Sequence, residues 1–215
     1  MSDHLDIRQS IIAACLDMNA NGLNQGTSGN ISVRVEDQML ITPTAVPYAK
    51  MSPEMIATLD LSGDMTGDYR GPNAPSSEWR FHWKILKERP EFNAIVHTHS
   101  PFCTTLAILR KPIPACHYMV AAFGGNDVKC SGYSAYGTPD LAAMALAALE
   151  GRSACLLANH GMIVAGKTLE QAMWRAVELE TLAKQYWQAL QAGEPVILSD
   201  AEIDETLQRF SGYGV

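Results

Sequence analysis

Two apolar segments, each followed or interrupted by histidine, constrain the fold of this chain most. The run AIV at residues 94–96 leads directly into His97, Thr98 and His99, and a second apolar run over residues 154–165 is interrupted at His160. Short apolar runs of this kind predict buried strands, in which residues i and i+2 point to the same face. Two imidazoles are therefore expected side by side on one face, with a third in a similar context.

The composition predicts one soluble intracellular domain. At 215 residues and 47% hydrophobic, the chain is long enough for one core, so we expect a single domain over residues 1–215. A net charge of −7 argues against binding to nucleic acid or an anionic membrane, and no segment approaches about 18 consecutive apolar residues. The N-terminus lacks the pattern of a signal peptide, and five scattered cysteines are typical of reduced thiols, which favours a cytoplasmic protein.

The order of the predicted elements indicates an α/β fold of the α+β type. Apolar periodicity predicts helices over 5–21, 76–88, 101–109, 139–150, 168–190 and 200–210. Strands are predicted over 31–35, 39–41, 56–61 and 156–164, and in the segment that ends in the histidine pair. Because strands and helices do not alternate strictly, we expect a central, mainly antiparallel sheet flanked by helices.

The histidines and one glutamate are candidate metal ligands. Glu78 is expected in the first turn of the helix capped by Ser76 or Ser77, where the helix dipole favours a carboxylate. Imidazoles from His97, His99 and His160 with this carboxylate suit Zn²⁺, with Fe²⁺, Co²⁺, Ni²⁺ or Mn²⁺ possible, whereas Mg²⁺ and Ca²⁺ prefer oxygen ligands. The alternative at this point is that these are core histidines whose ring nitrogens are hydrogen-bonded within the protein and bind no metal.

The other histidines have open roles. His82 lies four residues after Glu78 and shares its helix face, so it is either an alternative ligand or a residue that packs and holds the carboxylate in place. His117 is either structural or near the site. His4, close to the N-terminus, is not expected to take part.

Small and hydroxylated residues form a second candidate site. The segment GTSGN at 26–30 and the serines at 76 and 77 offer backbone N–H groups and hydroxyls, and Thr44 adds another donor. Such groups bind phosphate without a cationic side chain. An ordinary turn is the alternative for each segment taken alone.

The motifs together resemble a known family over nearly the whole chain. In order, they read QGTSGNISVR, MLITPTAVPY, SSEWRFH, AIVHTHS, IPACHYMVAAFGGN and LLANHGMIVAG. This pattern is similar to the class II aldolase/adducin family. The resemblance implies a three-layer fold with helices on both faces of the sheet, and a cyclic homotetramer with active sites between neighbouring subunits.

The resemblance also implies roles for individual residues. The metal ligands would be His97, His99 and His160, with Glu78 as the fourth in the free enzyme. The phosphate site would comprise Thr27, Ser28, Gly29, Asn30, Thr44, Ala45, Ser76 and Ser77. Tyr118 would reach the neighbouring subunit's site, and the aldehyde end would be lined by Tyr136, Phe210 and Tyr213. The chain departs from the pattern with Ala45 where glycine is frequent and Tyr136 where phenylalanine is usual.

The implied reaction is reversible cleavage of a ketose 1-phosphate to dihydroxyacetone phosphate and an aldehyde. L-Fuculose 1-phosphate, 5-deoxyribulose 1-phosphate and 5-methylthioribulose 1-phosphate are the substrate types. Glu78 would exchange a proton with the ketone fragment, and Tyr118 would exchange one with the aldehyde oxygen. The alternatives are a sugar-phosphate epimerase, dehydratase or decarboxylase of the same family, an adducin-like interaction module without the metal, and a zinc hydrolase.

Overall fold

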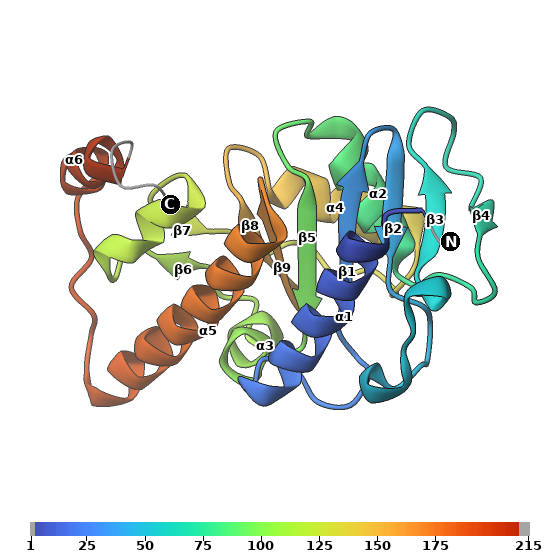
Figure 1. Ribbon diagram of the computed structural model, residues 1–215. Coiled ribbons are helices and arrows are strands. Elements are labelled where there is room, and N and C mark those ends of the chain that lie inside the picture. Colours follow the sequence, from blue (N-terminus) through green and yellow to red (C-terminus); the bar gives the residue numbers. More distant parts are fainter. Residues whose placement is uncertain (1–2, 211–215) are drawn as a thin grey trace.

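The computed structural model, which describes residues 3–210, is built around one antiparallel sheet (Figure 1). Every neighbouring pair of strands in it runs antiparallel. In spatial order its strands are β4 (Tyr69–Arg70), β3 (Ala57–Asp60), β2 (Gln38–Ile41), β1 (Asn30–Val35), β5 (Ala94–Thr98), β9 (Gly161–Gly166) and β8 (Ala154–Leu157).

Helices cover both faces of this sheet, which gives three layers (Figure 1). One face carries α1 (Leu5–Ala20), α3 (Pro101–Ile108) and α5 (Leu169–Ala192), and the other carries α2 (Trp79–Glu88) and α4 (Pro139–Ala148). Alternate residues of β5 serve the two layers: Val96 packs toward α1, α3 and α5, and Ile95 packs toward α2 and α4. The predicted fold class is confirmed, and His97 falls on the same face as Ile95.

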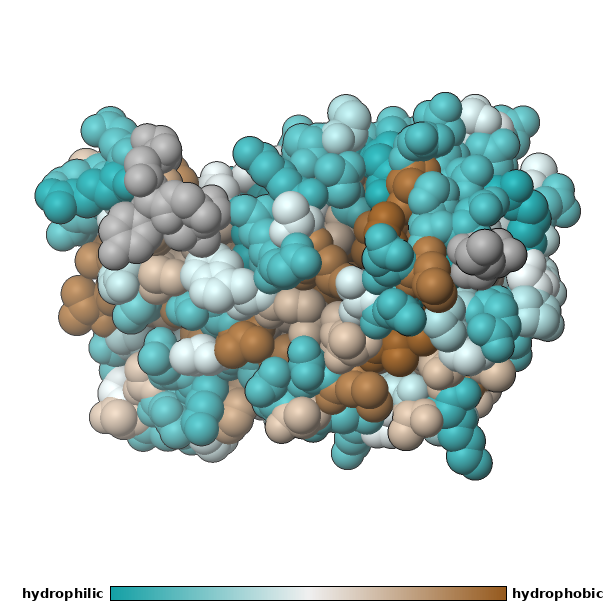
Figure 2. All heavy atoms as spheres, in the orientation of Figure 1, coloured by the Kyte–Doolittle hydropathy of each residue, from teal (hydrophilic) through white to brown (hydrophobic). Residues whose placement is uncertain are grey.

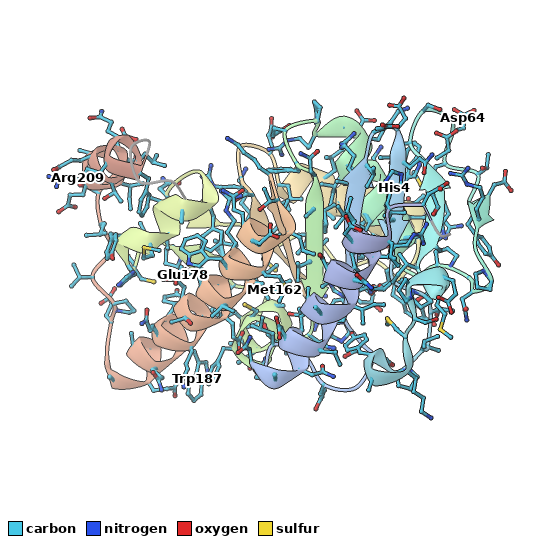
Figure 3. The ribbon with its side chains drawn as sticks, viewed as in Figure 1. His4, Asp64, Met162, Glu178, Trp187 and Arg209 are labelled. Carbon is cyan, nitrogen blue, oxygen red and sulfur yellow. The ribbon has the colours of Figure 1, made fainter. Side chains whose placement is uncertain are left out.

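A smaller layer lies beside the sheet, at the end of the molecule opposite β4 (Figure 1). It holds a two-stranded sheet of β6 (Ile113–Pro114) and β7 (Asp127–Val128), the 3₁₀ helix η3 (Tyr118–Phe123) and the helix α6 (Asp200–Phe210). Ile203 of α6 is buried against Ala115 and Ala121. Figure 3 shows Arg209 on α6 at this outer end, whereas Met162 of β9 lies at the centre behind α5. Two short 3₁₀ helices, η1 (Tyr48–Lys50) and η2 (Pro53–Met55), connect β2 to β3.

Two predicted elements differ from the structure. The single strand predicted over 156–164 is two strands, β8 and β9, joined by a tight turn in which Leu157 pairs with Gly161. Asn159 makes this turn with a φ of 55°, a left-handed conformation that asparagine tolerates better than most residues. The segment 62–75, in which the sequence analysis places no helix or strand, contains β4, a two-residue edge strand that pairs with β3.

The surface over α1 and α5 is mixed in character. Figure 2 shows apolar residues scattered among polar ones on this face. Leu5 and Leu16 of α1 and Trp174 and Val177 of α5 are among the exposed apolar side chains. Among residues 3–210, no helix is both long enough and apolar enough to cross a membrane.

Candidate metal centre and its cavity

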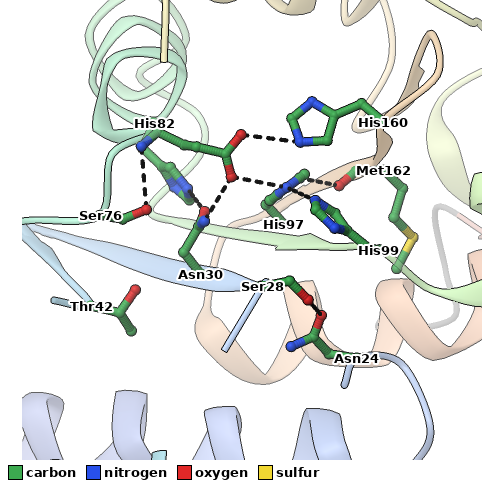
Figure 4. Close-up of polar contacts among 12 residues, drawn as sticks. Asn24, Ser28, Asn30, Thr42, Ser76, His82, His97, His99, His160 and Met162 are labelled. Carbon is green, nitrogen blue, oxygen red and sulfur yellow. Dashed lines mark hydrogen bonds and ion pairs between the residues drawn. The ribbon is translucent and has the colours of Figure 1, made fainter. Parts of the chain in front are cut away.

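Four candidate metal ligands converge at one end of β5: Glu78, His97, His99 and His160. One ligand atom from each lies within 4.8 Å of all the others, and the three imidazole centroids are 4.9–5.0 Å apart. His97 is the last-but-one residue of β5 and His99 follows the strand, so the i, i+2 spacing turns both rings to the α2 side. Figure 4 shows the three histidines gathered around one carboxylate. Residues distant in sequence thus form one four-member donor set.

The tautomer of His97 leaves a lone pair aimed into this cluster. Its Nδ1 donates to the carbonyl oxygen of Met162 at 2.8 Å, so Nε2 carries no proton in the neutral ring. Nε2 lies 3.1 Å from His99 Nε2 and 3.2 Å from Glu78 Oε2. Burial, then the neighbouring His97 and His160, lower the pKa of His99 to about 4, so its ring is neutral at physiological pH.

Glu78 occupies the N-cap position of α2 rather than its first turn. The Ser76 hydroxyl, two residues before this N-cap, accepts a hydrogen bond from the Glu78 N–H at 3.3 Å. The Glu78 carboxylate makes no capping hydrogen bond to the helix and contacts His97 and His160 instead. Its Oε1 lies 3.1 Å from His160 Nε2 and forms no hydrogen bond with any described residue.

The Glu78 carboxylate is anionic despite its burial. Burial opposes ionisation, but the contacts with His97 and His160 outweigh it and hold the pKa of Glu78 well below its usual range. A buried carboxylate with one oxygen that no described residue hydrogen-bonds, grouped with three imidazoles, offers the donor atoms of a divalent transition-metal site. His82 is not a member of the cluster: it lies behind Asn30, with its Nε2 2.5 Å from Asn30 Oδ1.

The turn that carries His160 depends on Gly161. A Cβ at this position would collide with the carbonyl oxygen of Thr98 and would lie 3.0 Å from the His99 ring. We expect Gly161→Ala to lower the free energy of unfolding by about 1–3 kcal/mol, because β5 and β9 must separate locally. Chemical denaturation measures this change.

Gly63→Ala is the matched control for that substitution, because no atom lies within 4 Å of a Cβ built at Gly63. Its free energy of unfolding should stay close to that of the unsubstituted chain. Equal stabilities of the two variants would contradict the close approach of β5 and β9 at Gly161.

A cavity of about 440 Å³ opens above the donor cluster. No lysine or arginine is among the described residues that line it. Besides Glu78, His99 and His160, the structure brings to its wall every residue predicted to bind phosphate: Thr27, Ser28, Gly29, Asn30, Thr44, Ala45, Ser76 and Ser77. A pocket walled by small residues, hydroxyls and backbone N–H groups suits an anion such as phosphate.

Two residues missed by the sequence analysis support the loop before β1. Tyr48 donates to the carbonyl oxygen of Gly29 at 2.6 Å and accepts from Asn24 at 3.1 Å. Asn24 also accepts from the Ser28 hydroxyl at 3.0 Å. A Cβ at Gly29 would lie 2.8 Å from the carbonyl oxygen of His97, so only glycine lets this loop approach β5 so closely. Tyr48 lies in the stretch MLITPTAVPY, but nothing in a single sequence indicates its partner.

Ala45 adopts the left-handed conformation that its place in the pattern implies. Its φ is 56°, a region in which glycine carries no steric penalty and alanine does. Alanine therefore holds this conformation in the loop at a steric cost that glycine would not carry.

The aromatic residues predicted at the aldehyde end lie in different places. Tyr136 lines the cavity and is joined there by Tyr133 and Ser134, which were not predicted. Tyr118 is half exposed on η3, where its ring packs near His117 and Phe210, and it does not line this cavity. Phe210 is likewise away from it, and Tyr213 lies outside the described residues. The roles of all four stay predictions.

His117 has a structural contact. Its Nδ1 accepts a hydrogen bond from the backbone N–H of Met119 at 3.2 Å and so caps the start of η3. This contact favours a structural role for His117.

Comparisons with known proteins identify the family of this chain. Residues 9–187 match the model of the class II aldolase and adducin N-terminal domain. The chain is 51% identical over 208 residues to the 5-methylthioribulose-1-phosphate/5-deoxyribulose-1-phosphate aldolase of Rhodospirillum rubrum, covering 97% of this chain and 92% of that one. It is 45% identical over 210 residues to the L-fuculose phosphate aldolase of Escherichia coli, covering 97% and 96%.

The solved structures agree with this result. An L-fuculose 1-phosphate aldolase superposes with a TM-score of 0.91 at 37% sequence identity, with 98% of each chain covered. The chain therefore belongs to the class II aldolase and adducin family, and it groups with the aldolases, which are the lyases of that family.

Proposed function

We propose that this protein reversibly cleaves a ketose 1-phosphate into dihydroxyacetone phosphate and an aldehyde with the help of a bound divalent metal ion. The observation that carries the proposal is the position of the Glu78, His97, His99 and His160 cluster at the floor of a cavity walled by hydroxyls and small residues. The two relatives described above are named as aldolases of sugar phosphates of this type. The whole chain, residues 1–215, would act as one domain.

The donor set supports Zn²⁺ as the metal. Three imidazole nitrogens and one carboxylate match the ligands and the four-fold coordination that Zn²⁺ prefers. Fe²⁺, Co²⁺, Ni²⁺ and Mn²⁺ accept the same ligand types and are the alternatives. When bound, such an ion supplies Lewis acidity toward the carbonyl oxygen of the substrate.

The side chains around the cluster would divide the remaining work. Glu78, ionised in the free protein, exchanges the proton at the carbon next to the carbonyl of the ketone fragment. The loop from Thr27 to Asn30, with Thr44, Ala45, Ser76 and Ser77, binds the phosphate and fixes the distance of the reacting carbons from Glu78. Tyr136, at the cavity mouth, would contact the aldehyde end.

Tyr118 would complete the site from a neighbouring subunit of a homotetramer. Its side chain is 51% exposed, its ring lies near those of His117 and Phe210, and it does not line the cavity of its own chain. A tyrosine presented outward in this way can exchange a proton with the aldehyde oxygen in an adjoining site. Phe210 and Tyr213 would lie near the same boundary. The five free cysteines support a reducing compartment, the cytoplasm.

The test is release of dihydroxyacetone phosphate from a panel of ketose 1-phosphates, measured with a coupled reductase. The panel comprises L-fuculose, 5-deoxyribulose and 5-methylthioribulose 1-phosphates and the same sugars without phosphate. We expect cleavage of at least one phosphate ester by zinc-loaded protein, no cleavage of the free sugars, and loss after chelation that added zinc reverses. No release from any ester would refute the proposed reaction.

A further inference from the structure

A chain of buried hydrogen bonds lies behind the metal cluster and ends on Glu78. The Ser32 hydroxyl contacts His82 Nδ1 at 2.7 Å. Next, His82 Nε2 contacts Asn30 Oδ1 at 2.5 Å, and Asn30 Nδ2 donates to Glu78 Oε2 at 3.0 Å (Figure 4). Ser32 and His82 have no exposed surface, and Asn30 and Glu78 keep 4% and 5%. Such hydrogen bonds are stronger than exposed ones, and each member is costly to leave unpaired.

For a neutral His82 ring, only one arrangement of protons pairs a donor with an acceptor at every contact of this hydrogen-bond chain. The Glu78 carboxylate accepts only, so Asn30 must present its NH₂ group to it and its Oδ1 to His82. His82 Nε2 must then carry the proton, which leaves Nδ1 to accept from the Ser32 hydroxyl. All donors point toward Glu78. A reversed amide would set two oxygens against each other about 3.0 Å apart.

The residues of this hydrogen-bond chain come from two elements, the strand β1 and the helix α2. Asn30 and Ser32 project from the same face of β1, and Asn30 lies opposite His97 in the antiparallel register. His82 stands one turn beyond Glu78 on α2, and its ring stacks on Phe81 at 4.6 Å between centroids. The hydrogen-bond chain therefore connects the start of α2, where Glu78 lies, to β1, the strand that pairs with the histidine-bearing β5.

We propose that His82 is a positioning residue that sets the orientation of the Glu78 carboxylate through Asn30. This inference rests on the proposed function of Glu78. With the amide held, Oε2 is fixed by Asn30 and Oε1 is directed to His160. The same amide N–H marks the place to which the carboxylate returns after each proton exchange. A group that must act within a narrow geometry gains from support of this kind.

His82→Phe is the main test, because phenylalanine keeps a flat ring beside Phe81 but cannot donate to Asn30. We expect kcat to fall about 10–100-fold, with KM for the phosphate ester little changed. His82→Gln is the rescue variant, since its amide can again donate to Asn30 Oδ1, and it should regain most of kcat. A purely structural role would instead lower the melting temperature and leave kcat of the folded protein unchanged.

The Co²⁺-loaded protein supplies a readout that is independent of turnover. Its visible ligand-field bands depend on how the carboxylate is presented to the metal. We expect these bands to shift in His82→Phe and to return in His82→Gln. If the unsubstituted protein binds Co²⁺ but cleaves none of the ketose 1-phosphates, the proposed function is refuted. In that case the Co²⁺ bands of the variants still show whether His82 positions Glu78.

Ser32→Ala tests the far end of the chain with a matched control. It removes the donor that fixes the His82 tautomer, so kcat should fall, though less than in His82→Phe. Ser153→Ala deletes a hydroxyl of similar burial that has no partner among the described residues, and kcat should not change. Unchanged kcat and unchanged Co²⁺ bands in both His82→Phe and Ser32→Ala would overturn the proposal.

Discussion

Replacement of Glu78 by glutamine is expected to lower kcat for ketose 1-phosphate cleavage by about 10²–10⁴-fold, the usual contribution of a general acid and base. The substitution keeps the size of the side chain and its hydrogen bond from Asn30 Nδ2. It removes the negative charge that His97 and His160 stabilise, and with it the ability to take a proton. Because three imidazoles remain, the metal should be retained, and elemental analysis of the purified variant checks this.

Glu88→Gln is the control for the loss of charge. Glu88 is exposed at the far end of α2, so the variant has the same net charge and the same helix without touching the cluster. Its kcat should equal that of the unsubstituted protein. Full activity of Glu78→Gln with a normal metal content would remove Glu78 from the reaction.

The pairing of His97 with His99 was predictable because a strand has a fixed period. The side chains of two residues that are two positions apart on a strand point to the same face of the sheet. The buried run before His97 was sufficient to identify the strand. The same period accounts for the two packing faces of the sheet, to which Val96 and Ile95 point in opposite directions. The central antiparallel sheet with its helices followed from patterns of this local kind.

The placement of His160 and Glu78 was less accurate because it depends on turns. An apolar run with a short polar interruption can form either one strand or a hairpin, and the left-handed Asn159 shows where the backbone reverses. Glu78 was expected in the first turn of α2, behind a serine cap, and instead lies at the N-cap position itself. Its carboxylate makes no capping hydrogen bond and is free to contact the histidines. Despite these differences from the prediction, both His160 and Glu78 lie in the cluster at the end of β5.

The polar support of the site was beyond prediction from one sequence. His82 was left open between ligand, support and packing, because an i+4 spacing from Glu78 is compatible with each. The outcome depends on Asn30, which β1 brings opposite His97 and between His82 and Glu78. Tyr48 and Asn24 hold the cavity loop through contacts 19 and 24 residues apart in sequence, and no local pattern encodes such pairs.

His160→Ala is expected to abolish stoichiometric metal binding. His160 supplies one of three nitrogens, and its Nε2 is the neighbour of Glu78 Oε1, an oxygen with no hydrogen bond among the described residues. Without it, His97, His99 and Glu78 remain, but a water molecule must replace a nitrogen ligand. Zinc at 100 times its dissociation constant stabilises a folded protein by about 2.7 kcal/mol, which corresponds to a rise of about 5–11 °C in melting temperature for a chain of this size. The unsubstituted protein should show this rise, and His160→Ala should lose most of it.

His4→Ala is the control for His160→Ala, because it removes a histidine without removing a member of the donor cluster. His4 is exposed before α1 and lies outside the donor set, so this variant should keep both the metal and the zinc-dependent rise in melting temperature. In the absence of zinc, His160→Ala should melt close to the metal-free parent, because His160 is only partly buried and its N–H to Leu157 is a backbone contact that alanine retains. Unchanged zinc content in His160→Ala by elemental analysis would therefore refute the proposed ligand set rather than report a folding defect.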